Sequence, residues 1–528
     1  MGGSIFEAYS AGAAGGFFKS HFARIDDRNR ARAVLRPIAP ALADALETQN
    51  ARYAPSAKRA EHLLALRNGA AAVVTGQQVG LFLGPLFTLY KCATTIRLAQ
   101  ALAKEWRVAV VPVFWLQTED HDLAEIAETH VAGLRGEPLS LKLAVPADPV
   151  SVAHRTLPAE ITACLQALGE ALGHLPHAES HLERLARHYR PGAGWVEAFA
   201  GVIAELFADE GLVLLDPRDP ALAELAAPVH RRALLESRPI AEALGERIRA
   251  LDAAGMSAVV HIRDAAPLSF FHPDGPEGPR YRLAAAGDGF AEVGGIGKHT
   301  EAALLAALAA RPAAFSTSAL LRPILQDTWL PTAAYVGGPA EIGYFAQLAP
   351  LYDAFEMTMP LIVPRIRIRL LEDKTRKRLA RRTLTADDVC RPFDEALNRA
   401  RVDAPGEPSG AALSQRLLEE FERSLRAVTP VLSNAGNNMD KAIDRTRATV
   451  ARAVGKLAHK YDTARQYQDQ GLIEDLQRLQ WRLYPNGHPQ ERYYGMSYFA
   501  ARYGERPFIE RVLATAAPFE VAPKDLDL

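Results

Sequence analysis

Short apolar runs alternate with helical stretches between about residues 70 and 365. Five runs predict buried strands: Ala71–Thr75, Val108–Trp115, Gly211–Leu215, Ala258–Ile262 and Ala333–Val336. Between the first two, apolar residues of Pro85–Glu105 recur with the three- and four-residue spacing of a helix packed on a sheet. A strand, a helix and a second strand form a βαβ unit, which indicates a parallel sheet. The pattern predicts an α/β protein whose Rossmann-like parallel-sheet core occupies residues 1–365.

Two segments interrupt this alternation. Residues 130–195 show only weak strand patterns. Residues 264–299 contain FFHPDGPEGPRYRL and AEVGGIGKHT, which predict turns and short hairpins. We interpret both as connecting insertions, which we expect to form one wall of an active site.

The pattern changes after residue 365. Nine basic residues lie between Arg365 and Arg382, and a link that contains Asp403–Pro408 follows. We interpret residues 366–410 as a basic helix and a linker. The basic face has two interpretations, a solvated surface or a phosphate contact for a nucleotide. Because aromatic residues are not interleaved with the basic ones, a nucleic-acid groove is not expected.

Two long helical patterns occupy residues 411–485. Leu413, Leu417, Phe421 and Leu425 mark the first, and Ile443, Val450, Val454 and Leu457 mark the second. No proline interrupts residues 439–483. The pair predicts an antiparallel coiled-coil hairpin that forms a homodimer, although part of it could instead be covered by its own domain. Residues 486–528 are expected to pack back on the core.

Composition narrows the class of protein. Apolar residues make up 48% of the 528 residues, and the net charge is −1, so no global field attracts nucleic acid or acidic membrane. Three cysteines, far apart, exclude a disulfide scaffold and a thiolate zinc site. MGGSIFEAYSAGAAGG lacks the features of a signal peptide, and the most apolar run, Val108–Leu116, is too short for a bilayer. We expect a cytoplasmic protein with neither nucleic-acid nor membrane partners.

The first candidate site is TGQQVGLFLGPLFTLYK, residues 75–91. Its glycines recur every fourth residue, which matches neither the dinucleotide fingerprint nor the Walker loop. Gly76, Gly80 and Gly84 would let a ligand approach the backbone, and Pro85 suits the first turn of a helix whose N-terminus favours an anion. The amides of Gln77 and Gln78 suit a sugar or an amide. The alternative is a plain strand-to-helix turn.

The second candidate site is WLQTEDHDLAEI, where Glu119, Asp120, His121 and Asp122 follow a predicted strand. Such residues can supply a general base, orient an amine or hold magnesium. The alternative for Asp122, with Glu125, is an acidic helix cap.

The third candidate site lies within residues 320–345. Arg322 can clamp a carboxylate, or it can pair with Asp327. Gly337-Gly338-Pro339 and Glu341 then open a helix, as the first loop does. The sequence lacks the G-x-S-x-G, H-E-x-x-H, kinase and class I aminoacyl-tRNA synthetase motifs.

Together, TGQQVGLFLGPLFTLYK, VPVFWLQTEDHDLAEI and LLRPILQDTWLPTAAYVGGPAEIGYFAQL resemble the bacillithiol biosynthesis cysteine-adding enzyme family. The resemblance covers essentially the whole chain. It implies a Rossmann-like core with two insertions, a C-terminal coiled coil and a homodimer. The implied reaction joins the carboxyl group of cysteine to the amine of glucosaminyl-malate, as the last step of bacillithiol biosynthesis.

The matching blocks define the candidate residues. The catalytic candidates are Glu119, Asp120, His121 and Asp122. The substrate-binding candidates are Thr75, Gly76, Gln77, Gln78, Gly84, Pro85, Lys91, Arg322, Gln326, Asp327, Tyr335, Gly337, Gly338 and Glu341. Activation of a carboxylate implies ATP, and the acidic cluster is where magnesium is expected with it; no dedicated metal site is predicted.

Two other functions are consistent with the same residues. One is a nucleotidyl- or glycosyl-transferase on a Rossmann-like core, which would show no dependence on cysteine. The other is a non-catalytic coiled-coil protein that binds a ligand without turnover. Two glycine loops and an acidic cluster are more than a passive scaffold needs, which favours an enzyme.

Overall fold

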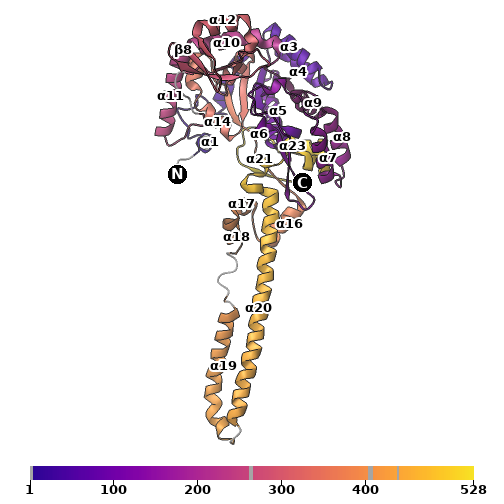
Figure 1. Ribbon diagram of the computed structural model, residues 1–528, viewed down its shortest axis with the longest axis vertical. Coiled ribbons are helices and arrows are strands. Elements are labelled where there is room, and N and C mark those ends of the chain that lie inside the picture. The colour runs from indigo at the N-terminus through magenta and orange to yellow at the C-terminus, as the bar shows by residue number, and fades with distance from the viewer. Residues whose placement is uncertain (1–3, 261–265, 402–407, 409, 437–438) are drawn as a thin grey trace. The chain divides into compact units, whose positions relative to one another are not determined.

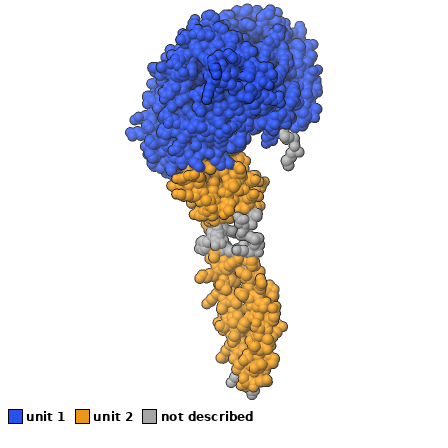
Figure 2. All heavy atoms as spheres, turned by 180° about the vertical axis from the view of Figure 1, so that it is seen from behind, with its two compact units in different colours: residues 1–370, 490–528 blue, residues 371–489 orange. Residues whose placement is uncertain are grey.

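A computed structural model describes residues 4–260, 266–401, 408, 410–436 and 439–528 (Figure 1). The chain divides into two compact units, drawn in blue and orange in Figure 2. Unit 1 comprises Met1–Leu370 and Gln490–Leu528, and unit 2 comprises Leu371–Pro489. We keep the sequence-based boundaries at residues 365, 410 and 485 as a proposal.

Unit 1 is built on a five-stranded parallel sheet. Its order is β12 (Leu361–Pro364), β11 (Thr332–Gly337), β1 (Ala71–Gln77), β2 (Val110–Leu116) and β5 (Val213–Leu215). Counted along the chain, this is the Rossmann strand order 3-2-1-4-5, and the direction of winding reverses between β1 and β11. Ligands of such sheets bind at the carboxyl ends of the strands beside this switch point.

Alternate residues of β2 enter two hydrophobic cores. Phe114 and Leu116 join one core, and Val113 and Trp115 join the other. Helix α5 (Phe87–Trp106) connects β1 to β2 and contributes to both cores. Strands buried on both faces explain the continuous apolar runs in the sequence.

The connection from β2 to β5 contains a hairpin and several helices. These elements are α6 (Leu123–Ile126), β3 (Glu128–Ala132), β4 (Pro138–Lys142), α7 (Ile161–Leu172), α8 (Ala178–His188) and α9 (Trp195–Leu206). They share the first core with α22 (Ser497–Tyr503) and α23 (Glu505–Thr515) from the end of the chain.

The connection from β5 to β11 contains a second, antiparallel sheet. Its order is β10 (Phe315–Thr317), β6 (Ser269–Phe271), β7 (Tyr281–Ala286), β8 (Gly289–Val293) and β9 (Lys298–Thr300). Helices α10 (Ala223–Leu235) and α12 (Glu301–Ala310) pack on it. The prediction of turns and hairpins in residues 264–299 is confirmed over the described part.

The predicted strand Ala258–Ile262 is wrong over residues 258–260, and residues 261–262 lie outside the described part of the chain. The backbone N–H groups of Val259 and Val260 donate to the side-chain oxygen of Gln347, at 3.2 and 3.0 Å. Val259 is also 46% exposed. The backbone N–H groups here are thus hydrogen-bonded to a side chain, and not to a neighbouring strand as the apolar run predicted.

The remaining elements of unit 1 surround these sheets. They are α1 (Ile5–Ser10), α2 (Ile25–Ala31), α3 (Pro40–Ala51), α4 (Ala57–Arg67), α11 (Ser237–Ala253), α13 (Arg322–Trp329), α14 (Pro339–Phe345), α15 (Ala349–Ala354), α21 (Gln490–Tyr493), and the pair β13 (Ile368–Leu371) and β14 (Lys524–Asp527).

Unit 2 consists of helices. Short helices α16 (Asp373–Arg381), α17 (Ala386–Val389) and α18 (Phe393–Arg401) pack on one end of α20 (Met439–Leu483). Helix α19 (Gly410–Ser433) lies beside the other end of α20, which confirms the predicted helical pair (Figure 1). Residues 403–407 of the predicted link lie outside the described chain.

The basic helix α16 exposes Lys374, Arg376 and Lys377 to solvent, as one interpretation expected, while its last turn also contacts a buried carboxylate. Arg378 and Arg382 contact the carboxylate of Asp475 at 3.1 and 2.8 Å, and Arg381 pairs with it too. Asp475 is buried, so its charge is balanced by these arginines within unit 2.

Among the described residues, none of the helices combines the length and the apolar composition that crossing a bilayer requires.

Candidate active site

A cavity of about 470 Å³ opens at the carboxyl ends of β1, β2 and β11, beside the switch point of the sheet. The predicted residues that line it are Gly76, Gln77, Gln78, Lys91, Glu119, Asp120, His121, Arg322, Gly338 and Glu341. Those that do not line it are Thr75, Gly84, Pro85, Asp122, Gln326, Asp327, Tyr335 and Gly337. Charged or aromatic lining residues that the sequence did not indicate as site residues are Phe87, Glu125, Phe270, Arg280, Tyr344 and Arg492. Arg365 also lines the cavity and was indicated only as part of the basic run.

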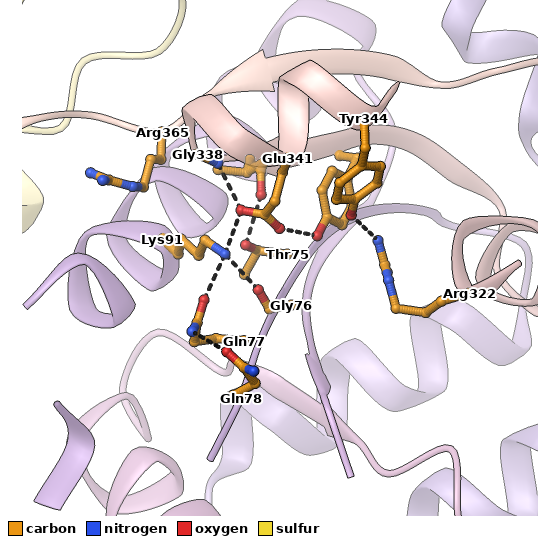
Figure 3. Close-up of polar contacts among 12 residues, drawn as sticks. Thr75, Gly76, Gln77, Gln78, Lys91, Arg322, Gly338, Glu341, Tyr344 and Arg365 are labelled. Atoms are coloured by element: carbon orange, nitrogen blue, oxygen red, sulfur yellow. Dashed lines mark hydrogen bonds and ion pairs between the residues drawn. The ribbon is translucent and has the colours of Figure 1, made fainter. Parts of the chain in front are cut away.

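Lys91 is the centre of a buried polar network across the switch point (Figure 3). Helix α5 places its ammonium 2.8 Å from the carbonyl of Gly76, 2.8 Å from Oε1 of Gln77 and 2.5 Å from Oε2 of Glu341. An ammonium has three N–H donors, and these contacts use all of them. One residue before Gly76 on β1, Thr75 Oγ1 donates to the carbonyl of Val336 on β11. Lys91 and Thr75 thus hold β1 to the β11–α14 turn.

Glu341 is held as a carboxylate by its surroundings. The backbone N–H of Gly338 donates to Oε2 at 2.8 Å, and the hydroxyl of Tyr335 donates to Oε1 at 2.5 Å. Burial acts to raise the pKa of Glu341, but Lys91 and the two hydrogen bonds together lower it below its usual value. Burial in turn lowers the pKa of Lys91, against the effect of Glu341.

Arg322, the first residue of α13, brings a buried positive charge to the cavity. Its guanidinium donates to Oε1 of Gln326 at 2.8 Å and to the hydroxyl of Tyr344 at 2.9 Å. Only 2% of the residue is exposed, and no carboxylate of the described chain lies within ion-pair distance of it. Buried charges normally have a charged partner. The side chain is therefore arranged for an anionic ligand.

Gln326 and Asp327 lie behind Arg322 and not in the cavity. Gln326 Nε2 donates to Asp327 at 2.8 Å, and Tyr352 donates to the other carboxylate oxygen. This orients the amide of Gln326 so that its oxygen faces Arg322. The direct pair of Arg322 with Asp327, one alternative from the sequence, is not formed.

The two glutamines link the basic network to an acidic corner. Gln78 Nε2 donates to Asp120 at 3.0 Å and to Glu125 at 2.6 Å, while Gln77 accepts from Lys91. Burial acts to raise the pKa of Asp120, but the amide of Gln78 and nearby N–H groups lower it below its usual value. This corner is therefore anionic at neutral pH.

Two residues of the acidic cluster, Glu119 and Asp122, make structural hydrogen bonds. Glu119 accepts the backbone N–H of Thr317 at 2.9 Å as well as its hydroxyl, which ties the end of β2 to β10. Asp122 accepts the N–H of Glu125 and caps α6, as the alternative from the sequence proposed. Within the described residues no group of three His, Cys, Asp or Glu side chains is placed to hold a metal ion. Magnesium that is held together with the phosphates of a nucleotide needs only one or two protein carboxylates, so magnesium at this cluster stays a prediction.

His121 lines the cavity with a ring that is suited to accept a proton. Its Nδ1 is buried and has no hydrogen-bond partner in the described chain. Burial lowers the pKa of His121, and the nearby charge of Arg280 lowers it further. The neutral imidazole therefore predominates at neutral pH.

The later glycines of the first loop serve chain packing. A Cβ at Gly84 would collide with Oγ1 of Thr129, and one at Gly80 would collide with the carbonyl of Gly84. The N–H of Leu86 donates to the carbonyl of Tyr494 at 2.7 Å. Of the three glycines, the cavity lining includes Gly76.

Arg365 and Arg492 extend the basic side of the cavity. Arg365, from the start of the basic run, is 3% exposed and donates to Glu491 at 2.7 Å, with its guanidinium carbon 5.2 Å from the centre of the Phe87 ring. Arg492 is exposed. In the sequence, Arg365 belongs to the run of basic residues, whereas none of the patterns that we used indicated Arg492.

Comparison with known proteins gives matches along nearly the whole chain. The model of the N-terminal Rossmann-like domain of bacillithiol biosynthesis BshC matches residues 6–366, and that of its C-terminal coiled-coil domain matches residues 368–523. A protein of Salinibacter ruber is 34% identical over 465 residues, which are 88% of this chain and 84% of the relative. One of Koribacter versatilis is 34% identical over 484 residues, 88% of this chain and 85% of the relative. Both carry the name "Putative cysteine ligase BshC".

The two family models match successive parts of the chain, and they agree with the Rossmann-like sheet and the long helical pair. The relatives align over most of the chain. The chain belongs to the bacillithiol biosynthesis BshC family.

Proposed function

We propose that this protein is a cysteine ligase that joins the carboxyl group of cysteine to the amine of glucosaminyl-malate, the last step of bacillithiol biosynthesis. Family membership supports the class of reaction. The observation that carries the proposal is the distribution of charge in the cavity. Arg322 is a buried cation without a carboxylate partner in the described chain, and Asp120 with Glu125 forms an anionic corner.

Glucosaminyl-malate has the complementary charges, since it carries two carboxylates at one end and an amine at the other. In our proposal the malate carboxylates bind Arg322 and Arg492, whose guanidinium groups retain N–H donors. The ammonium then lies near Asp120 and Glu125. His121 accepts its proton, which leaves a neutral amine to attack the acyl carbon.

Amide formation from a carboxylate requires the departure of one carboxylate oxygen. ATP as a co-substrate would supply this by transferring a phosphoryl or adenylyl group to that oxygen, which leaves on the phosphate when the amine adds. Lys91 is not available to bind a phosphate, because its three donors contact the protein. The arginines that line the cavity are the groups that could bind it. We assign no step to magnesium.

The proposal is tested by mass spectrometry after incubation of the full chain with glucosaminyl-malate, cysteine and ATP. We expect a product heavier than glucosaminyl-malate by one cysteinyl residue, and none when ATP is omitted. Consumption of ATP without this product would instead support a nucleotidyl- or glycosyl-transferase. Binding of glucosaminyl-malate without any turnover would support a passive ligand-binding protein.

The proposal includes a homodimer formed through the α19–α20 hairpin, and a cytoplasmic location. A coiled-coil family domain supports the first. The second is supported by Cys92 and Cys164, which are buried thiols and not disulfides.

A further inference from the structure

The wall that the antiparallel sheet contributes to the cavity holds a further buried arginine, Arg280, to which the proposed function gives no role. Arg280 is 5% exposed, and its guanidinium carbon lies 3.8 Å from the centre of the Phe270 ring. One terminal nitrogen donates to the backbone carbonyl of Glu119, and the other donates to that of Thr317 at 3.2 Å. Arg280 and Phe270 both line the cavity.

Arg280 forms no direct ion pair with a carboxylate of the described chain, although the charges of Glu119 and Asp120 act on it from a longer distance. A guanidinium has five N–H donors, and the two hydrogen bonds both go to neutral carbonyl groups. Its Nε is buried without a hydrogen-bond partner, and no carboxylate of the described chain lies within ion-pair distance. The carboxylate of Glu119 is bound by Thr317, and that of Asp120 accepts from Gln78. Burial lowers the pKa of Arg280 to about 10, so the group remains charged at neutral pH.

Arg280 is also the cation beside the proposed base. The ring of Phe270, on which Arg280 stacks, has its centre 6.3 Å from that of His121. Among the charges that act on the pKa of His121, that of Arg280 has the largest effect. An anion bound by Arg280 would therefore lie close to the imidazole.

We propose that Arg280 binds the carboxylate of the acyl donor, an α-amino acid, next to His121. This rests on the proposed function, in which the amine that gives its proton to His121 must meet the acyl carbon. The carboxylate that contains this carbon must then lie within reach of the same imidazole. A planar guanidinium can present parallel N–H groups to both carboxylate oxygens, and Phe270 fixes its plane. Arg322 and Arg492 remain for the carboxylates of the amine substrate.

The test compares cysteine with cysteamine, which has the same thiol and amine but no carboxylate. Calorimetric titration of the full-length wild-type protein, with and without glucosaminyl-malate, is expected to show tighter binding of cysteine. Arg280→Gln should weaken the binding of cysteine about 10- to 100-fold and remove the preference over cysteamine. Arg280→Lys should keep part of the preference for cysteine, because the charge remains while the planar pair of donors is lost. The dissociation constant of glucosaminyl-malate should change less than about threefold in both variants.

Arg218 provides the control for a purely structural effect. It is also an arginine held by two backbone carbonyls, those of Phe315 at 2.9 Å and Pro276 at 3.1 Å, but it does not line the cavity. Arg218→Gln should lower the melting temperature about as much as Arg280→Gln does, without changing the ratio of cysteine to cysteamine affinity. The proposal is overturned if the wild type does not bind cysteine, if Arg280→Gln retains the preference, or if Arg218→Gln loses it as well.

The product assay separates this proposal from the ligase itself. Wild-type product formation, with an unchanged KM for cysteine in Arg280→Gln, would refute the carboxylate subsite and leave the ligase intact. Cysteine binding that depends on Arg280, without any amide product, would refute the ligase and leave the subsite.

Discussion

The pair formed by Lys91 and Glu341 connects the two glycine-containing turns through a single buried contact. Replacing Lys91 with Met removes the ammonium but keeps an unbranched apolar stem. Glu341, whose side chain is 18% exposed, then loses its cation, which should lower the free energy of unfolding by up to about 3 kcal/mol. Urea denaturation of the two proteins measures this difference.

The double variant Lys91→Met with Glu341→Gln is the control for this pair. It removes both charges, so it should recover part of the stability lost in the single variant. Equal unfolding midpoints for the wild type and Lys91→Met would show that the pair does not stabilise the fold.

His121 should determine the acidic limb of the pH dependence of catalysis. Its pKa lies below the usual value of about 6.5, because burial and Arg280 disfavour the imidazolium. A protonated ring cannot accept the proton of the amine, so kcat/KM should fall as the pH falls through this pKa. Asp120 has a pKa lowered from a still smaller value, so its titration should occur at lower pH.

In His121→Gln this limb should disappear, and kcat/KM at neutral pH should fall about 10²- to 10⁴-fold. The amide keeps a polar side chain of similar size at this position, so binding of glucosaminyl-malate should change little. An acidic limb that persists in the variant would assign the titration to another group.

Residue identity indicated the site only in part. His121 could be selected because its type and its position after a predicted strand suggest chemistry, and Arg322 because a guanidinium can clamp a carboxylate. Lys91 was selected from the resemblance to the family. Arg280 and Glu125 could not, because nothing local distinguishes an arginine in a turn-rich insertion from a surface one. They enter the cavity through long-range folding: Arg280 contacts Glu119, which is 161 residues away in the chain.

At the scale of elements, the glycine loop after β1 has two parts. Gly76 lines the cavity, whereas Gly84 lets the chain pass close to Thr129 of the β3–β4 hairpin. Gly84→Ala should therefore destabilise the protein by about 1–3 kcal/mol, because the new methyl group meets Oγ1 of Thr129.

A double-mutant cycle tests this assignment. Thermal or urea unfolding should show a smaller cost of Gly84→Ala in a Thr129→Ala background, where the hydroxyl is absent. The folded fraction of Gly84→Ala should bind glucosaminyl-malate as the wild type does. Weaker binding without any loss of stability would instead assign Gly84 to the ligand.

The central strands were predictable because both of their faces are buried, as Ala71–Val74 and Val111–Trp115 show. The expectation that an apolar run forms a buried strand failed at Val259, whose backbone N–H donates to the side chain of Gln347. The order of the strands was not available from local pattern, because β11 pairs with β1 across more than 250 residues. This pairing is what brings Glu341, in the first turn of α14 after β11, next to Lys91.

At the scale of the whole molecule, the α19–α20 hairpin has a thin core of its own. Leu425 and Ile443 are buried there, while Val431 is 74% and Leu457 is 59% exposed. Two further apolar residues of α19, Leu417 and Val428, are 45% and 48% exposed. A coiled-coil surface of this kind is typical of helices that pack against a second copy.

Val431→Glu together with Leu457→Glu should therefore convert a dimer into a monomer. Light scattering after size-exclusion chromatography should give half of the wild-type mass, with an unchanged helical signal in circular dichroism. Val431→Ile with Leu457→Met preserves the apolar surface and should remain dimeric. A monomeric wild type, or a dimer that tolerates both glutamates, would contradict assembly through this hairpin. Since the cavity is lined entirely by residues of unit 1, the monomeric variant should keep the affinity for glucosaminyl-malate.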